Sequence, residues 1–197
     1  SKNPTRKLIQ YIQSIQPDII HLHNIHGYYL NYPILFEFLS QYNAPVVWTL
    51  HDCWAFTGHC AHYMFIGCEK WKQHCEYCPN LKAYPKSLLF DRSYQNFEDK
   101  RREFTSLKNL TLVPVSNWLQ EQIEQSFLKE QNIITIHNGI DVQLFKPASN
   151  NKEILEKYKI NANKHIVLGI ASNWYHKGLE DFIKLRNILN NQYQYEI

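Results

Sequence analysis

The sequence predicts an α/β fold in which a mostly parallel sheet is covered by helices on both faces. Two observations lead to this prediction. Short apolar stretches alternate with longer segments whose apolar residues follow helical spacing, an order that is typical of a parallel sheet. Hydrophobic residues make up 44% and charged residues 20% of the 197 residues, so the chain can bury a core of ordinary size.

The first unit is expected to consist of four helices and four strands in alternation. The opening helix has apolar side chains at helical spacing from Leu8 to Ile15. Asn43 and Pro45 end the second helix, and Ser116 is expected to cap the fourth with its side-chain oxygen. The expected helices span residues 7–15, 32–42, 93–107 and 116–127. The expected strands span residues 19–23, 46–50, 110–114 and 133–137.

Residues 51–90 form a long irregular segment after the second strand, named here the cysteine loop because it carries all five cysteines. An irregular segment of this length in a compact domain is usually functional or held in place by other contacts. The cysteine loop is therefore a candidate functional region.

The domain organisation follows from a break after the fourth strand. Residues 1–138 are expected to form a first domain without an obvious opening strand, and residues 139–150 a hinge or linker. Residues 151–197 begin a second domain of the same kind. Its expected elements are a helix over 152–158, a strand over 165–170 and a helix over 178–189. Because so few residues follow the linker, we expect the chain to be an internal piece of a longer protein.

Charge and hydropathy exclude two classes of protein. The formal net charge is +3 and Lys and Arg are dispersed along the chain, so no nucleic acid is expected as a partner. No apolar run reaches the roughly 18–20 residues that a membrane span needs. The first residues lack the apolar segment of a signal peptide, so we expect a cytoplasmic protein with reduced thiols.

Polar residues follow two neighbouring strands of the predicted sheet. His23 ends the first expected strand, with Asn24 and Gly27 after it, and His51 and Asp52 follow the second. The carboxyl ends of strands face the ligand crevice in open α/β sheets, and a histidine there can exchange a proton with a hydroxyl or phosphate. The structural alternatives are a histidine buried in the core and a turn capped by the aspartate.

Four cysteines of the loop have the spacing of a metal site. Seven, six and two residues separate them in turn, so the set closes with a CxxC pair. Zinc is held by four such ligands in a tetrahedron, and an ion here would keep the long loop ordered. The alternative is a set of reduced, partly buried thiols. The four are Cys60, Cys68, Cys75 and Cys78, while Cys53 would remain a lone thiol.

Lys177 and Gly178 follow the predicted strand of the second domain and open its second helix. A lysine beside the free N–H groups of a helix start can hold a phosphate. The two residues are therefore a candidate phosphate-binding site.

Taken in order, these segments resemble retaining glycosyltransferases of family 4, which have the GT-B fold of two Rossmann-like domains. The resemblance is strongest to bacterial enzymes that build capsule or exopolysaccharide, and it spans nearly the whole chain. Each segment alone has low specificity, whereas the ordered set is specific. The matching segments are 18–24, 49–52, 54–58, 75–79, 116–119, 138–141, 169–171 and 177–179.

The resemblance implies a role for each domain. The first would bind the acceptor, a glycan or lipid-linked saccharide at the inner membrane face, with Asn138 and Gly139 at the cleft beside the hinge. The second would bind a nucleotide-diphosphate sugar, with Lys177 on its diphosphate. His51 would contact the transferred sugar. Such enzymes usually need no metal for the chemistry, so a zinc ion at the cysteines would be structural.

Three features depart from the family pattern. The stretch 169–176 lacks the arginine that many relatives carry before the lysine. The family's paired glutamates would lie beyond Ile197 and its glycine-rich loop before Ser1, so we expect no activity from this piece alone. The alternative function is a zinc-stabilised interaction module without catalysis.

Overall fold

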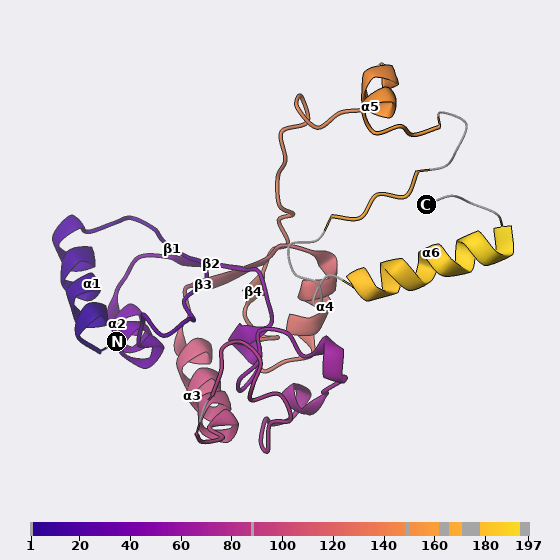
Figure 1. The fold of residues 1–197 in the computed structure, drawn as a ribbon. Coiled ribbons are helices and arrows are strands. Elements are labelled where there is room, and N and C mark those ends of the chain that lie inside the picture. The colour runs from indigo at the N-terminus through magenta and orange to yellow at the C-terminus, as the bar shows by residue number, and fades with distance from the viewer. Residues whose placement is uncertain (1, 88, 149, 162–165, 171–177, 194–197) are drawn as a thin grey trace. The chain divides into compact units, whose positions relative to one another are not determined.

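The computed structural model describes residues 2–87, 89–148, 150–161, 166–170 and 178–193 (Figure 1). The chain forms two compact units, Ser1–Gly139 and Ile140–Ile197. The first unit contains the sheet and the cysteine loop, so it positions the strand-end residues.

A four-stranded parallel sheet forms the centre of the first unit, which confirms the predicted α/β fold class. The strands lie in sequence order, β1-β2-β3-β4. Ile20 of β1 lies beside Val46 of β2, which lies beside Leu110 of β3. Because all strands run in one direction, their carboxyl ends meet at one edge of the sheet. The strands are β1 (Ile20–Leu22), β2 (Val46–Leu50), β3 (Leu110–Pro114) and β4 (Asn132–Ile133).

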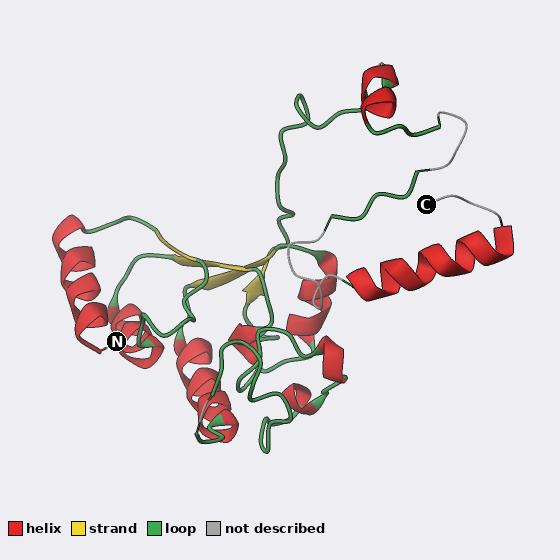
Figure 2. Cartoon of the chain, viewed as in Figure 1, coloured by secondary structure: helices red, strands yellow, loops and turns green. Residues whose placement is uncertain are grey.

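Helices α2, α3 and α4 lie on one side of this sheet (Figure 2). Parallel strands that follow one another in order are joined by crossovers of the same hand, which places the connecting helices on the same face. Asn31 caps α2 by accepting from the Ile34 N–H, and Ser116 caps α4 by accepting from the Leu119 N–H, which confirms the cap predicted there. The helices are α1 (Lys2–Ile15), α2 (Tyr32–Gln41), α3 (Ser93–Ser106) and α4 (Asn117–Glu124).

The largest differences from the predicted bounds occur at three elements. Helix α1 begins at Lys2 rather than at residue 7, because its first turn is polar and carries no apolar periodicity. Helix α4 ends at Glu124, because the Ser126 hydroxyl accepts from a backbone N–H two residues later and forms a turn. Strand β4 is two residues long, although the N–H groups of Ile134 and Ile136 still donate to carbonyls of β3.

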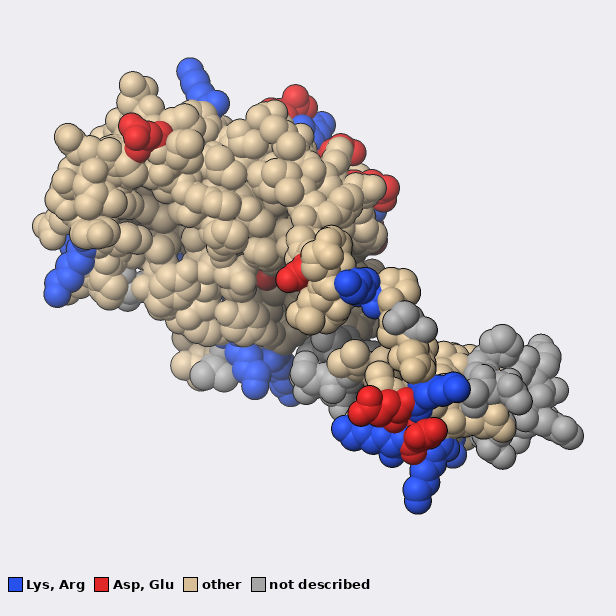
Figure 3. Space-filling view, turned by 90° about the horizontal axis from the view of Figure 1, so that it is seen from above, with Lys and Arg blue, Asp and Glu red and all other residues tan. Residues whose placement is uncertain are grey.

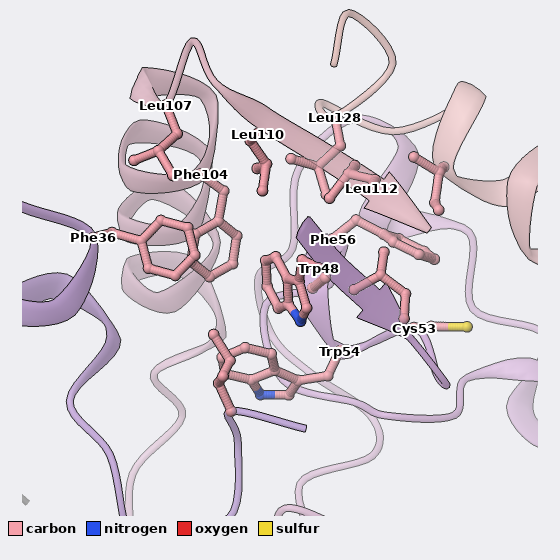
Figure 4. Close-up of a cluster of buried hydrophobic side chains, with 14 of the residues drawn as sticks. Phe36, Trp48, Cys53, Trp54, Phe56, Phe104, Leu107, Leu110, Leu112 and Leu128 are labelled. Carbon is pink, nitrogen blue, oxygen red and sulfur yellow. The ribbon is translucent and has the colours of Figure 1, made fainter. Parts of the chain in front are cut away.

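Trp48 in the middle of β2 lies at the centre of the hydrophobic core (Figure 4). Its ring packs against Phe36 of α2 at a centroid distance of 5.7 Å and against Phe104 of α3 at 4.9 Å. The residues of β2 alternate between buried and half-buried, so its buried side chains face these helices. The core therefore fixes the strand whose end carries His51.

The cysteine loop packs onto α3 through a buried lysine. Lys100 of α3 is 1% exposed, and its Nζ donates to the carbonyls of Trp54 at 2.7 Å and of Thr57 at 2.8 Å. The ammonium also lies 3.6 Å from the centre of the Trp54 ring. Burial lowers the pKa of Lys100 well below its ordinary value, although nearby thiol and carboxyl groups act in the opposite direction. The loop contains three short 3-10 helices, η1 (Trp54–Phe56), η2 (Met64–Ile66) and η3 (Lys70–Lys72).

The second unit contains helices α5 (Lys152–Lys157) and α6 (Leu179–Tyr193) in its described ranges. Residues 166–170 pair with no strand among the described residues, so the strand predicted there is wrong for this segment: a strand needs a hydrogen-bonded neighbour. The Phe182 ring of α6 lies against Gly169, where an added Cβ would come within 3.2 Å of it. None of residues 140–148, 150–161, 166–170 and 178–189 is buried.

Charged side chains lie around the rim of the first unit on the face drawn in Figure 3, and both signs occur there. The Lys and Arg side chains therefore form no continuous basic surface on this face of the described residues. No helix in the described ranges combines the length and the apolar character that crossing a bilayer requires.

Candidate functional site

Two histidines meet where β1 and β2 end. His23 follows β1 and His51 follows β2, and the parallel register places these ends side by side. The His23 Nδ1 lies 3.1 Å from the His51 Nε2, and the two rings stack with centroids 5.4 Å apart. Two imidazole nitrogens in a hydrogen bond need one donor and one acceptor, so the pair shares one proton along this contact. The structure thus brings together two of the residues singled out in the sequence.

Neighbouring groups orient this histidine pair. His21 points to the same face of β1 as His23, with ring centroids 4.3 Å apart, and both residues are exposed rather than buried in the core. The His21 Nε2 is 2.8 Å from the Thr49 Oγ1 of β2. The Trp48 Nε1 donates to the His23 carbonyl at 3.0 Å. These contacts join β1 to β2, so the sheet itself places the His23–His51 pair.

Asp52 pairs with a third histidine. Its Oδ2 lies 2.9 Å from the His26 Nε2, and its Oδ1 accepts from the Trp54 N–H at 2.9 Å, which is the turn considered as the structural alternative. A carboxylate only accepts, so His26 donates from Nε2 and can accept at Nδ1 from the Tyr84 hydroxyl 3.2 Å away. Asp52 is adjacent to His51 in sequence, but its side chain therefore pairs with His26.

The surroundings of Asp52 favour its ionised form. Burial by itself would raise the pKa of this carboxyl. The hydrogen bonds from His26 and from the Trp54 N–H, together with the charges of His26 and His62, outweigh burial and lower the pKa below its ordinary value. Only 9% of the His26 side chain and 15% of the Asp52 side chain are exposed, so water screens the pair weakly. The ionised carboxylate therefore holds the His26 ring in one orientation.

The loop between β1 and α2 turns tightly at Gly27. This residue has φ of +100°, a conformation that favours glycine, and an added Cβ would come within 2.8 Å of the Tyr84 hydroxyl. The Tyr29 hydroxyl donates to the Asn24 carbonyl at 2.5 Å. Gly27 thus allows the cysteine loop to approach closely, while Asn24 contributes a backbone oxygen to the turn.

The strand ends enclose a small pocket that adjoins a wider groove. The groove has a volume of about 310 Å³ and shares Trp54 with the pocket. The rings of Tyr28, Tyr32 and Trp54 line the groove together with the cationic Lys86 and Arg92. Aromatic faces next to cations suit a ligand that has both apolar ring faces and negative charge. The polar residues lining the pocket include His23, Asn24, His26, Thr49, His51 and Asp52.

The four cysteines predicted as metal ligands line a single small pocket in the cysteine loop. The Sγ atoms of Cys60 and Cys78 are 4.0 Å apart, and all of these cysteines are free thiols. Within the described residues, no three His, Cys, Asp or Glu side chains already stand in the geometry of a metal site. Cys53 lies apart in the core, where burial and the charge of Asp52 raise its pKa to about 12, so it is a poor nucleophile.

Two other predicted site residues of the first unit do not line the strand-end pocket. Asn138 and Gly139 are exposed and do not line the pocket. Gly178 lies in the second unit, with φ of +66°, just before α6. Lys177 lies outside the described residues. The phosphate-binding site therefore stays a prediction.

Sequence reasoning missed His26 and Tyr84. His26 stands between a strand end and Gly27, and that position was a usable signal for a site residue. Tyr84 is 58 residues from His26 in sequence, and no local pattern indicates their contact. The contact between Tyr84 and His26 becomes apparent only when the path of the cysteine loop is known.

Comparison with known proteins agrees with this geometry. The model of Glycosyltransferase Family 4 matches residues 2–144, which include nearly all of the first unit. Over 96 residues the chain is 38% identical to WcaC of Escherichia coli (strain K12), named as a colanic acid biosynthesis glycosyl transferase. That alignment covers 46% of this chain and 23% of the relative, so the chain matches less than a quarter of the relative's length. Since the family match extends over the sheet and both strand-end histidines, the chain belongs to glycosyltransferase family 4.

Proposed function

We propose that the whole protein moves a sugar from a nucleotide-diphosphate sugar to a glycan or lipid-linked saccharide in surface polysaccharide biosynthesis, with retention of configuration. Membership of family 4 supports a transferase. The name of the Escherichia coli relative supports a role in polysaccharide biosynthesis. The observation that carries the proposal is the His23–His51 pair at the carboxyl ends of β1 and β2.

We assign His51 to contact with the transferred sugar. Its Nε2 is engaged with His23, while its Nδ1 has no hydrogen-bond partner among the described residues. The residue is exposed, so a substrate can reach it. Its imidazole can accept a proton from a sugar hydroxyl or donate one. Asp52 acts less directly, because its carboxylate positions His26 beside the same pocket.

The acceptor is assigned to the groove beside the pocket. The Tyr28 and Trp54 rings offer flat apolar faces, and Lys86 and Arg92 offer positive charge for a phosphate or acidic sugar. A glycan or lipid-linked saccharide has both kinds of group. A lipid-linked acceptor would place the reaction at the cytoplasmic face of the inner membrane. In this proposal, Asn138 and Gly139 belong to the acceptor side of the cleft near the hinge.

The donor diphosphate is assigned to Lys177 and Gly178. In the transfer, the bond between the anomeric carbon and the phosphate oxygen breaks, the acceptor hydroxyl oxygen bonds to that carbon, and the hydroxyl proton passes to the leaving phosphate or to solvent. The leaving diphosphate gains negative charge, which a lysine and the N–H groups of a helix start can stabilise. We therefore propose that the chemistry itself needs no divalent metal.

Transfer by the full-length protein and by its His51→Ala variant tests this function. Sugars carried by UDP, GDP and ADP are offered with a lipid-linked acceptor fraction, and thermal unfolding is followed with each free diphosphate. We expect at least one diphosphate to raise the unfolding temperature of the wild type. Loss of the imidazole should lower the transfer rate by about 10²-fold. The matched control is His62→Ala, which removes an exposed histidine that does not line the pocket.

Two results would count against the proposal. A folded His51→Ala protein that transfers at the wild-type rate would remove His51 from the mechanism. Absence of both transfer and thermal protection with all three diphosphates would favour the alternative of a non-catalytic interaction module.

A further inference from the structure

Four cysteines of the cysteine loop take no part in the proposed transfer. They approach one another in space although 18 residues separate the first from the last. The loop around them contains only three short 3-10 helices within its described residues. Regular secondary structure therefore contributes little to holding this segment, and the grouped thiols require another explanation.

The spacing of the thiols fits a zinc ion. Four sulfurs at about 2.3 Å from a tetrahedral zinc ion stand about 3.8 Å from one another. The Sγ atoms of Cys60 and Cys78 are already 4.0 Å apart, close to that value. Cys68 and Cys75 line the same pocket. The four side chains do not yet converge as a formed metal site, so binding requires thiol side chains to rotate inward.

Hydrogen-bond donors already point at the sulfurs. The Gly58 N–H lies near the Cys75 sulfur, and the Asn80 N–H lies near the Cys78 sulfur. The Asn80 Nδ2 also lies 3.5 Å from the Cys60 Sγ. Donors of this kind orient metal ligands and stabilise thiolates.

The buried lysine supplies charge of the required sign. A zinc ion with four thiolates carries a net charge of −2, which is costly to bury without a cation nearby. The Lys100 ammonium is 1% exposed and lies within electrostatic reach of Cys75 and Cys60. A thiolate centre would in turn explain why an ammonium is tolerated at this depth in the core.

We propose that Cys60, Cys68, Cys75 and Cys78 hold one structural zinc ion. On binding, the four thiols release four protons to solvent and form four Zn–S bonds without a change of oxidation state. Four protein ligands close the tetrahedron, so the ion has no open position for a substrate. It stabilises the cysteine loop, and it takes no part in sugar transfer.

Metal analysis of the full-length protein tests the proposal. The protein is purified under reducing conditions without added metal, and zinc is measured by mass spectrometry. We expect one zinc per chain in this loop, released when a mercurial titrates the thiols. Cobalt exchanged into the site should give the intense visible bands of a tetrahedral thiolate complex. Cys60→Ser and Cys78→Ser should each lower the bound zinc at least ten-fold, whereas Cys53→Ser should keep it.

The amount of zinc bound per wild-type chain tests the proposal even if the serine variants fail to fold. The proposal would be overturned if the folded wild type contained no zinc and its four thiols were free. A disulfide between Cys60 and Cys78 in the reduced preparation would also overturn it. Zinc should remain in the His51→Ala variant. The zinc measurement and the transfer assay therefore test the two proposals independently.

Discussion

At the scale of single residues, three nearby histidines have three kinds of partner. His23 contacts another imidazole, His21 contacts a hydroxyl group, and His26 contacts a carboxylate. The partner depends on which strand or loop faces each ring. The contact to the carboxylate involves an ionised oxygen, so it should weaken when acid protonates that carboxylate.

Replacing Asp52 by Asn is expected to lower the free energy of unfolding at neutral pH by about 1–3 kcal/mol. The amide keeps an acceptor for the Trp54 N–H but removes the charge that His26 contacts. Folding lowers the pKa of Asp52 below its ordinary value of 3.8. The stabilisation is therefore present above that value and is lost as pH falls through the pKa of the folded state.

Urea unfolding at about pH 7 and about pH 3.5 measures this difference. The gap in unfolding free energy between wild type and Asp52→Asn should shrink at the lower pH, because the unfolded wild type then binds a proton at Asp52 more readily than the folded state does. The control is Asp141→Asn, which changes an exposed turn carboxylate and should alter stability by only about 0.5 kcal/mol. If wild type and Asp52→Asn differed equally in unfolding free energy at both pH values, the charge of Asp52 would not contribute to stability.

At the scale of elements, the cysteine loop approaches α3 too closely for a side chain at Gly58. An added Cβ would lie 2.3 Å from the Ser93 carbonyl oxygen and 2.6 Å from the Cys75 Cβ. Both atoms belong to packed segments, so backbone must shift. Gly58→Ala is therefore expected to lower the free energy of unfolding by about 1–3 kcal/mol.

The matched control is Gly139→Ala. An added Cβ at Gly139 meets nothing within 4 Å, so the change should stay within about 0.5 kcal/mol. Urea unfolding of both variants compares them directly. If Gly58→Ala were as stable as Gly139→Ala, the close packing of the loop on α3 would be disproved.

Elements with a local signal are the ones that the sequence predicts best. Strands β2 and β3 have the predicted bounds, because each is a short apolar run ended by turn residues. The topology of a parallel sheet also explains why His23 and His51 could be expected at one edge. The contacts of His26 could not be predicted, because they depend on how the cysteine loop returns to the strand ends.

At the scale of the whole molecule, the two units differ in how much they bury. Strands β2 and β3 have buried side chains, whereas none of residues 140–148, 150–161, 166–170 and 178–189 is buried. Amides exchange slowly where opening would expose a core. In the 197-residue chain, we therefore expect the amides of β2 and β3 to exchange far more slowly than those of α5 and α6.

Hydrogen exchange followed by mass spectrometry checks this expectation. Peptides from the two units serve as controls for each other, because they come from the same sample. Protection in α6 equal to that in β2 would contradict the prediction. It would mean that apolar side chains such as Leu168, which is 78% exposed, are covered in solution.

The pairing of β2 with β3 has a consequence for the speed of folding. Val46 lies beside Leu110, so the chain must close a path of more than sixty residues before these strands meet. Loop closure costs entropy that rises by about 0.6 kcal/mol for each doubling of length, and such distant pairings form slowly. A metal ion that ties Cys60 to Cys78 shortens this path. The ion would then speed the pairing of β3 with β2, although it takes no part in the sugar transfer itself.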